Sequence, residues 1–487
     1  MATNDAKTSE PVKAAAVKPV ATVKTPVAAK VAAPAKGSTA SKVGAAVRTL
    51  APMVPLAIAL AHKAIAPSPS TPAVAPAAVT QSSTVSSGAA PVPLLAKGHA
   101  VDWWFVFKLN AGKFPQCGGG TRTCPFGGTV QAYPAGFGQQ YVVASSEAPA
   151  LVDGQHDCLG STTDDPVGAS FDEVYSGSYH YAIWNDQPYG DPKIPACTSA
   201  GNCDAPWGHS KGMVAWNDAG EGFVMQVSTP SWPAAGSSKF PRKTDGNTLG
   251  CVKDDDLEVS QHFFALRLTK SDLVLVLQGL QNASVVTDPS DPQIVNNGGP
   301  ADVQALVKSL GTKSASETLV EGTLSTGVKL ISKPSAMNVP PWQMVSSQLG
   351  GVSLRTATWW ASPQIPSTTA TSTITCWDES LGKPGPVEIA TSGTWKGTVF
   401  GLEGGLGTNF NHAKIGVSTS GTASYAIFGD ENQQGTLTGK CSSSQNGRGG
   451  TFYVVNNAAL AESMTALLAG TSAPVEGATA APAAAAQ

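Results

Sequence analysis

The sequence has few charged residues and no long apolar run suited to a membrane, and both shortages exclude classes of protein. Only 13% of its 487 residues are charged, whereas glycine and proline contribute 51 and 36 residues. This composition is typical of a loop-rich exported protein rather than a helical cytosolic one. The apolar stretch at residues 50–61 is too short to cross a bilayer and contains two prolines, so we expect no membrane span.

The eight cysteines lack any Cys-x-x-Cys pair, which argues against zinc ribbons and thioredoxin-like redox sites. Their number is even, and two sets are closely spaced. We therefore predict disulfides and an oxidising, extracytoplasmic location (secreted or periplasmic), with buried free thiols as the alternative. Spacing alone leaves the connectivity open. The pairing that we predict is Cys117–Cys124, Cys197–Cys203, Cys158–Cys251 and Cys376–Cys441.

Acidic residues are scarce in the first 98 residues and abundant afterwards. Residues 1–98 contain ten Lys or Arg and two acidic residues, whereas the rest of the chain carries a net charge of −11. A body this acidic is not a general binder of polyanions. A contact with nucleic acid therefore has to be local, or has to form at a pH where more carboxylates and histidines are protonated.

Low-complexity sequence at both ends limits the part that can fold. Residues 1–98 are rich in Ala, Pro and Lys and almost free of aromatics, so they cannot bury a core and we predict disorder. Within them, residues 48–66 are a candidate export signal, and an apolar piece of a disordered tail is an equally supported reading. The Ala/Pro-rich residues 470–487 form a second predicted tail.

Between the tails, strand-like and helix-like patterns alternate in two halves, which predicts a mixed α/β (α+β) fold. The polar residues 281–300 contain a Gly-Gly-Pro triplet and read as a connection. We therefore predict an N-terminal lobe at residues 99–290 and a C-terminal lobe at residues 291–469. In the first lobe, Ser271 is the expected N-cap of a helix.

Two His-x-Lys pairs about two hundred residues apart carry the strongest chemical signal. His209 and Lys211 precede one buried-strand pattern, and His412 and Lys414 precede another. On a strand, residues i and i+2 point to the same face, so each imidazole and its ammonium can enter one site. The ammonium repels a metal ion but suits a phosphate, which a histidine can attack or protonate. Two pairs indicate one site made from two halves, whereas a lone pair would read as a surface feature.

The order of several motifs resembles that of the deoxyribonuclease II family. The matching motifs are Asp102-Trp-Trp-Phe-Val-Phe-Lys-Leu109, Asn185-Asp186-Gln187-Pro188, Gly208-His-Ser-Lys-Gly212, Ser228-Thr-Pro-Ser-Trp-Pro233 and Gly429-Asp430-Glu431-Asn432. The resemblance covers about residues 99–468. It implies a phospholipase D-like pseudo-dimer of two lobes, each a mixed β-sheet flanked by helices, with one His-x-Lys from each lobe in a single site.

The sequence departs from these family patterns at four positions. Trp216 and Thr419 stand where phospholipase D enzymes place an Asp, five positions after the Lys, although the deoxyribonuclease II family generally lacks that Asp. Ala413 replaces the more frequent Ser of the second pair, and Ser231 replaces the Asn of a Pro-Asn-Phe-Pro run. The side chain of Ala413 should point away from the site, so this departure has little consequence.

The resemblance implies metal-independent, cofactor-free cleavage of DNA that leaves 3′-phosphate and 5′-hydroxyl ends. In the expected mechanism His209 attacks phosphorus and forms a phosphohistidine, while His412 protonates the leaving 5′-oxygen; the sequence leaves the reverse assignment open. Lys211 and Lys414 hold the non-bridging oxygens, and Asn432 is a neutral donor. One imidazole must start neutral and the other protonated, so an ordinary pKa of about 6.5 predicts an optimum in mild acid.

Other residues and functions complete the set of expectations. The candidate substrate-binding residues are Asp186, Ser228 and Asp430, and Asp186 is also expected to orient a histidine or cap a turn. His262 is expected to be structural, and Trp359 to pack in the core or to stack on bases. We expect DNA as the substrate and no obligate protein partner, and a homodimer stays open. The alternatives are a phosphodiesterase that acts on phospholipid or RNA, a metal-dependent nuclease, and a catalytically silent secreted binding protein.

Overall fold

The computed structural model describes the folded body of the chain with several gaps. The described residues are 88–114, 120–122, 131–133, 140–154, 159–160, 162–187, 194, 203–230, 232–233, 236–241 and 258–475. All of them belong to one compact unit, Ser82–Gln487. The fold is a mixed α+β fold, with five α-helices in the described part. The candidate export signal at residues 48–66 lies outside the described residues.

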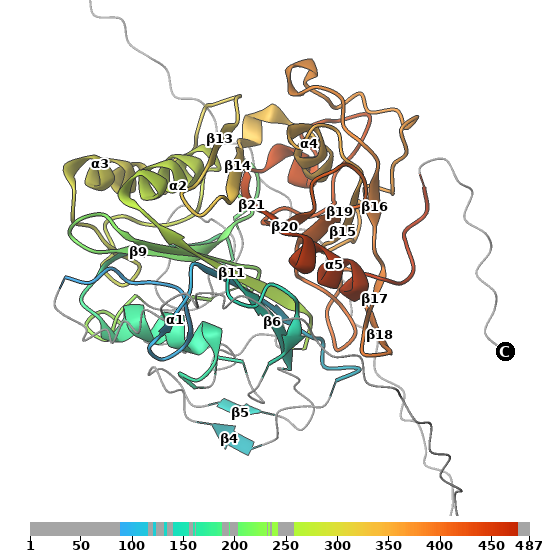
Figure 1. Cartoon of the computed structure of the whole chain (residues 1–487). Helices are drawn as coiled ribbons and strands as arrows, with labels where there is room; N and C mark the ends of the chain where they lie inside the picture. The colour runs from blue at the N-terminus through green and yellow to red at the C-terminus, as the bar shows by residue number, and fades with distance from the viewer. Residues whose placement is uncertain are drawn as a thin grey trace, which may run out of the picture. The chain divides into compact units, whose positions relative to one another are not determined.

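An eight-stranded antiparallel sheet forms the first half of this unit (Figure 1). Its strand order is β12-β8-β9-β10-β11-β3-β6-β7. The bounds are β3 Trp103–Lys108, β6 Tyr141–Ser145, β7 Val152–Asp153, β8 His180–Asn185, β9 Lys211–Trp216, β10 Gly222–Val227, β11 Gln261–Leu268 and β12 Val295–Asn296. Every residue of β9 and β10 is buried, which explains why both strands read as continuous apolar runs rather than alternating ones.

A seven-stranded sheet forms the second half, in the order β13-β14-β21-β20-β19-β15-β16. Its bounds are β13 Val320–Thr323, β14 Lys329–Lys333, β15 Leu354–Ala357, β16 Val387–Ile389, β19 Ile415–Ser418, β20 Tyr425–Gly429 and β21 Gly450–Asn456. Only β15 and β16 pair in parallel in this sheet. The second His-x-Lys pair lies directly before β19, whereas Lys211 of the first pair is the first residue of β9.

Both sheets repeat one strand order around the His-x-Lys segment. The row β8-β9-β10-β11-β3 of the first sheet corresponds to β15-β19-β20-β21-β14 of the second. In the chain, a helix directly precedes β8 and β15, namely α1 (Pro166–Ser176) and α4 (Pro341–Gln348), and another follows β11 and β21, namely α2 (Lys270–Asn282) and α5 (Ala458–Leu467). The second copy differs because β16 and a hairpin are inserted between β15 and β19.

Shorter elements complete the described part. The three two-stranded sheets are β1 Leu94–Ala96 with β2 His99–Ala100, β4 Gly120–Arg122 with β5 Gln131–Tyr133, and the inserted hairpin β17 Ser392–Trp395 with β18 Thr398–Gly401. The remaining helical elements are α3 Ala301–Ser309 and the 3₁₀ turns η1 Ser335–Met337, η2 Glu379–Leu381 and η3 Ser444–Gly447. Every helix in the described ranges is too short or too polar to span a bilayer.

Aromatic rings join the two sheets face to face. Phe428 of β20 lies against Phe105 of β3 and Phe264 of β11, with ring centroids 4.4 and 4.5 Å apart. Phe264 also lies 5.6 Å from the ring of Tyr453 in β21. Because these four side chains are almost fully buried, they form a common core that fixes the two sheets against each other.

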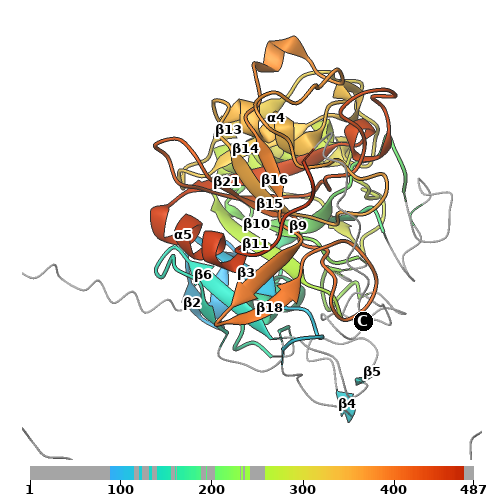
Figure 2. The same ribbon diagram turned by 90° about the vertical axis from the view of Figure 1, so that its right-hand side faces the viewer.

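Helices cover the outer faces of both sheets. On the first sheet, Trp232 packs between Phe171 of α1 and Phe263 of β11, at 5.4 and 5.7 Å between ring centroids. On the second sheet, Trp342 of α4 packs edge-on against Phe452 of β21 at 5.4 Å. Figure 2 shows strands of the second sheet between α4 and α5, and α5 joins the core between the sheets.

The folded body extends into both predicted tails. Leu94 is buried, and its backbone N–H donates to the hydroxyl of Ser170 at 2.9 Å. At the other end, Ala473 is buried and its N–H donates to the carbonyl of Ile389 at 2.8 Å. Residues 88–98 and 470–475 thus gain order from backbone pairing and a few apolar side chains, which composition alone does not reveal.

Two further boundaries in the structure differ from those predicted from the sequence. Because β12 pairs with β8, the first sheet continues past residue 290, the predicted end of the first lobe. The N-cap of α2 is Thr269 rather than Ser271. Thr269 accepts from the N–H of Asp272, and the Asp272 carboxylate accepts from the N–H of Thr269 at 2.9 Å. Ser271 does not make this reciprocal pair of bonds, which explains the shift.

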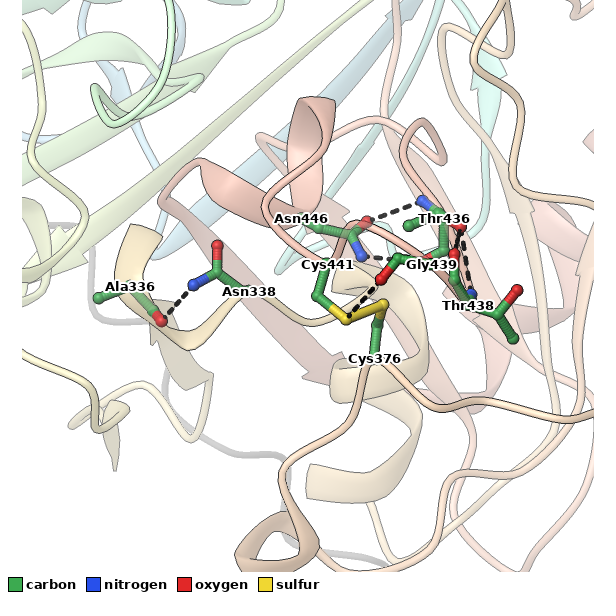
Figure 3. The surroundings of a disulfide bond; sticks show 8 residues. All are labelled: Ala336, Asn338, Cys376, Thr436, Thr438, Gly439, Cys441 and Asn446. Atoms are coloured by element: carbon green, nitrogen blue, oxygen red, sulfur yellow. Dashed lines mark hydrogen bonds between the residues drawn. A yellow bond between two sulfur atoms is a disulfide. The ribbon is translucent and has the colours of Figure 1, made fainter.

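The disulfide between Cys376 and Cys441 is confirmed (Figure 3). Its Cα atoms are 5.1 Å apart, and it closes a segment with a sequence separation of 65. Beside it, the side-chain amide of Asn446 donates to the carbonyl of Thr436 at 2.8 Å. The bridge therefore braces the loop that carries η3. The predicted pairings Cys117–Cys124, Cys197–Cys203 and Cys158–Cys251 involve cysteines outside the described residues.

Candidate active site

A cavity of about 410 Å³ collects five of the eight predicted site residues. Asp186 and His209 line it from the first half of the chain, and His412, Lys414 and Asn432 line it from the second. Both histidines are more than nine-tenths buried, so their rings meet the cavity rather than bulk solvent. The two His-x-Lys segments thus contribute to one site.

Each histidine is held by the backbone of the opposite half. The N–H of His209 donates to the carbonyl of Gly449, directly before β21, at 2.8 Å. The N–H of His412 donates to the carbonyl of Ser260, directly before β11, also at 2.8 Å. Since β11 and β21 occupy corresponding places in the two sheets, the contacts are reciprocal. The sheet packing therefore sets the positions of both histidines together.

The ring of His209 is fixed by a hydrogen bond from Nδ1 to the backbone carbonyl of Asp430, at 2.7 Å. A carbonyl oxygen only accepts, so Nδ1 carries the proton and the neutral ring keeps its lone pair on Nε2. Burial, followed by the nearby charge of Lys211, holds the pKa of His209 well below its ordinary value, and Asp186 opposes this shift. His209 is therefore a neutral imidazole with Nε2 available as a nucleophile.

The ring of His412 packs against Trp359, whose ring lies nearly edge-on with centroids 4.1 Å apart. Burial and then Lys414 hold the pKa of His412 well below its ordinary value, while a hydrogen bond with the backbone of Gly405 favours the protonated ring. Both imidazoles are thus neutral near pH 7. The mixture of one neutral and one protonated ring requires a more acidic solution than ordinary histidines would need.

Asp186 is the shared counter-ion of two cations. One carboxylate oxygen lies 2.6 Å from Nζ of Lys211, and the other lies 2.7 Å from Nη2 of Arg448. Burial alone would raise the pKa of Asp186, but its neighbours, Lys211 before His209 and Arg448, outweigh it, and the pKa falls below its ordinary range. Lys211 is 1% exposed and does not line the cavity among the described residues. Its predicted contact with a phosphate oxygen stays a prediction.

Two of the predicted substrate-binding residues stand behind the cavity wall. The hydroxyl of Ser228 accepts from the N–H of His262 at 2.8 Å. The carboxylate of Asp430 accepts from the N–H of Thr451 at 2.8 Å and from the amide of Gln226 at 3.0 Å, and burial raises its pKa to about 6. These contacts support β10, β11 and β21, and the carbonyl of Asp430 orients His209.

Asn432 and His262 meet the sequence expectations in different ways. Asn432 lines the cavity, and its side-chain amide nitrogen donates to Gln434 at 3.0 Å. His262 is fully buried, as expected for a structural residue, and its Nδ1 accepts from the backbone N–H of Lys414 at 3.1 Å. The first sheet therefore supports the second lysine through His262.

Sequence reasoning missed Arg448, which lines the cavity and binds Asp186. Its loop is held from below by Lys333, whose buried ammonium donates to the carbonyls of Asn446 (3.0 Å) and Arg448 (2.5 Å) and lies 3.3 Å from Glu431. Arg448 stands in the short run Asn-Gly-Arg-Gly-Gly, which has no chemical pattern of its own. Only its burial beside Asp186 marks it as part of the site.

The comparisons with known proteins agree with this geometry. A family model for deoxyribonuclease II matches residues 94–472. The chain belongs to the deoxyribonuclease II family. It is accordingly a hydrolase, a nuclease whose substrate is DNA, as the motif order predicted. The match also includes residues 94–98 and 470–472, which are part of the extension of the folded body beyond the expected boundaries. A comparison with curated proteins gives no match.

Proposed function

We propose that this member of the deoxyribonuclease II family is a metal-independent endonuclease that works through a phosphohistidine and leaves 3′-phosphate and 5′-hydroxyl ends. The observation that carries the proposal is that His209 and His412 line one cavity from two halves of the chain. The hydrogen bond from His209 Nδ1 to Asp430 supports Nε2 as the attacking atom. Lys211, Lys414 and Arg448 make the surroundings of both rings cationic, which favours a phosphate over a metal ion.

In the first step, the Nε2 lone pair of His209 attacks phosphorus and the bond between phosphorus and O5′ breaks. The proton of protonated His412 moves to O5′, so the leaving strand ends in a 5′-hydroxyl. The hydrogen bond between the His412 ring and Gly405 favours the protonated form that this role needs. Three neighbouring cations lower the pKa of each ring and favour its neutral form, and Asp186 opposes this effect at His209.

In the second step, water attacks phosphorus and gives one proton to His412. The bond between phosphorus and Nε2 breaks, its electrons return to His209, and the other strand is released with a 3′-phosphate. Lys414 and Asn432 stabilise the charge on the non-bridging oxygens. Because burial lowers the pKa of both histidines, we propose an optimum below pH 6.5, where His412 acquires its proton beside a bound phosphate.

We also propose that the two halves form a phospholipase D-like pseudo-dimer around this site. The support is the repeated order of helices and strands, together with the reciprocal bonds of His209 and His412 to Gly449 and Ser260. The third proposal is an extracytoplasmic location. The disulfide between Cys376 and Cys441 supports it, because such bonds persist in oxidising compartments.

Two variants and one small substrate test the histidine roles. Thymidine 3′-(4-nitrophenyl phosphate) has a leaving group that needs no proton. We therefore expect His412→Asn to release one equivalent of 4-nitrophenol and then to stall with the nucleotide bound covalently. His209→Asn should give no burst, and both variants should lose plasmid cleavage by about 10²–10⁴-fold. His99→Asn, a change at an exposed histidine, is the control.

The outcomes separate the alternatives. A burst from His209→Asn instead of His412→Asn reverses the two roles, and near-normal plasmid cleavage by either variant rejects the two-histidine mechanism. Plasmid digestion between pH 4 and 8, with and without a chelator, tests the metal and pH proposals. Loss of cleavage in the chelator would establish a metal-dependent nuclease, and parallel assays on RNA and phospholipid would reveal a broader phosphodiesterase.

A further inference from the structure

Arg448 has a guanidinium that is almost entirely bound to protein. Nη2 lies 2.7 Å from Asp186 and donates to the carbonyls of Cys203 (2.6 Å) and Gly208 (2.9 Å), while Nε donates to the carbonyl of Trp207 (3.0 Å). Within the described part of the chain, Nη1 makes no hydrogen bond. The residue is 8% exposed and lines the cavity. Among the described residues, Nη1 is therefore the donor group of Arg448 that stays available to a ligand in the cavity.

A guanidinium stays charged at every pH at which the enzyme works, and its donors match phosphate oxygens in geometry and charge. We propose that Arg448 is a catalytic residue whose Nη1 donates to a non-bridging oxygen of the scissile phosphate. This inference rests on the proposed function. The inference assigns the non-bridging phosphate oxygen on the His209 side of the site to Arg448. Lys211 is the less suitable donor, because it is paired with Asp186 and does not line the cavity among the described residues.

The charges that line the cavity support this assignment. Among the described residues that line the cavity, the lysine is Lys414 and the arginine is Arg448. They come from different segments of the second half. The guanidinium of Arg448 donates to the carbonyl of Gly208, which directly precedes His209 in the chain. The negative charge that develops on the phosphate during attack by His209 would therefore meet one cation from each segment.

The loop around Arg448 is rigid enough to place the guanidinium. Lys333 donates to the carbonyl of Arg448, and the next residue, Gly449, accepts from the N–H of His209 at 2.8 Å. Asp186 then holds the guanidinium from the other side at 2.7 Å. Arg448 and His209 are therefore fixed to the same short backbone segment, so that their relative positions change little when substrate binds.

The experiment compares full-length wild type with Arg448→Lys and Arg448→Gln on a DNA duplex that carries one phosphorothioate of defined Rp or Sp configuration. Wild type should cleave one diastereomer much more slowly than the oxygen substrate, because sulfur weakens the guanidinium contact. Both variants should lose about 10²–10³-fold in kcat on the oxygen substrate. They should also lose most of the difference between the diastereomers, which a purely structural role would leave intact.

Arg355→Lys is the matched control. Arg355 is also 8% exposed, donates to the carbonyl of Leu468 at 2.9 Å and pairs with Glu388 at 2.8 Å, but it does not line the cavity. It should lower stability and leave the discrimination between diastereomers unchanged. The same behaviour in folded Arg448 variants overturns the inference. A wild-type enzyme that cleaves both diastereomers at the oxygen rate overturns it without any variant. A wild type that cleaves no DNA overturns the proposed function, and this inference with it.

Discussion

Asp186→Asn is the most demanding test of the site electrostatics. The carboxylate is 1% exposed and holds Lys211 at 2.6 Å and Arg448 at 2.7 Å. Asparagine keeps the shape of the side chain but removes the negative charge, and its NH₂ group would face a cation. Two buried positive charges would then lack their counter-ion. We expect the fold to lose stability and the acidic limb of the pH–rate profile to move.

The size of the loss follows from the two ion pairs. Removing one partner of a buried pair costs about 3–5 kcal/mol, because the remaining charge stays buried without compensation. Since one carboxylate serves two cations here, we expect the upper end of that range. The effect on rate has a definite sign. Asp186 favours protonation of His209, so its removal lowers the pKa of His209 further. The acidic limb of kcat/KM, where the nucleophile becomes protonated, should therefore move to lower pH.

Urea unfolding at pH 7 and a pH series of kcat/KM on plasmid DNA would measure both effects. Asp165→Asn is the control, because Asp165 is also buried and accepts from the N–H groups of Gly160 (3.0 Å) and Gly168 (2.8 Å), away from the cavity. It should destabilise the fold without moving the pH profile. The reasoning is refuted if Asp186→Asn unfolds within about 1 kcal/mol of wild type and keeps the same acidic limb.

Two further predictions concern stability. Replacing Cys376 and Cys441 together by serine opens a closed segment with a sequence separation of 65, so the free energy of unfolding should fall by about 4 kcal/mol, and an unchanged urea midpoint would contradict this. His262 has a pKa well below its ordinary value in the fold, so the unfolded chain binds a proton below about pH 6.5 that the folded chain does not, and stability falls as the pH drops. At pH 5 this proton costs up to about 2 kcal/mol of stability. The difference in the free energy of unfolding between pH 7 and pH 5 should therefore be smaller for His262→Gln than for wild type, and equal differences would refute the effect.

The order of the motifs was sufficient to predict the family, and the local patterns were sufficient for many elements. The continuous apolar runs after Lys211 and Lys414 became β9 and β19, and the pattern near residue 270 became α2. The spacing of His and Lys indicated a phosphate site in two halves, and both histidines line one cavity. Such features depend on neighbours along the chain, so periodicity and residue type reveal them.

The sequence by itself thus determined the mixed fold and singled out the two histidines, whereas the structure established the pairing of Cys376 with Cys441. Only the tertiary structure decided that Asp186 binds Lys211 and Arg448, that Asp430 orients His209 through its backbone, and that the imidazoles of His209 and His412 are buried. Arg448 lies 262 residues from Asp186, and Asp430 lies 221 residues from His209, so these groups meet only when the sheets pack. Burial and charge at such a meeting point depend on distance in space, which local sequence patterns do not encode.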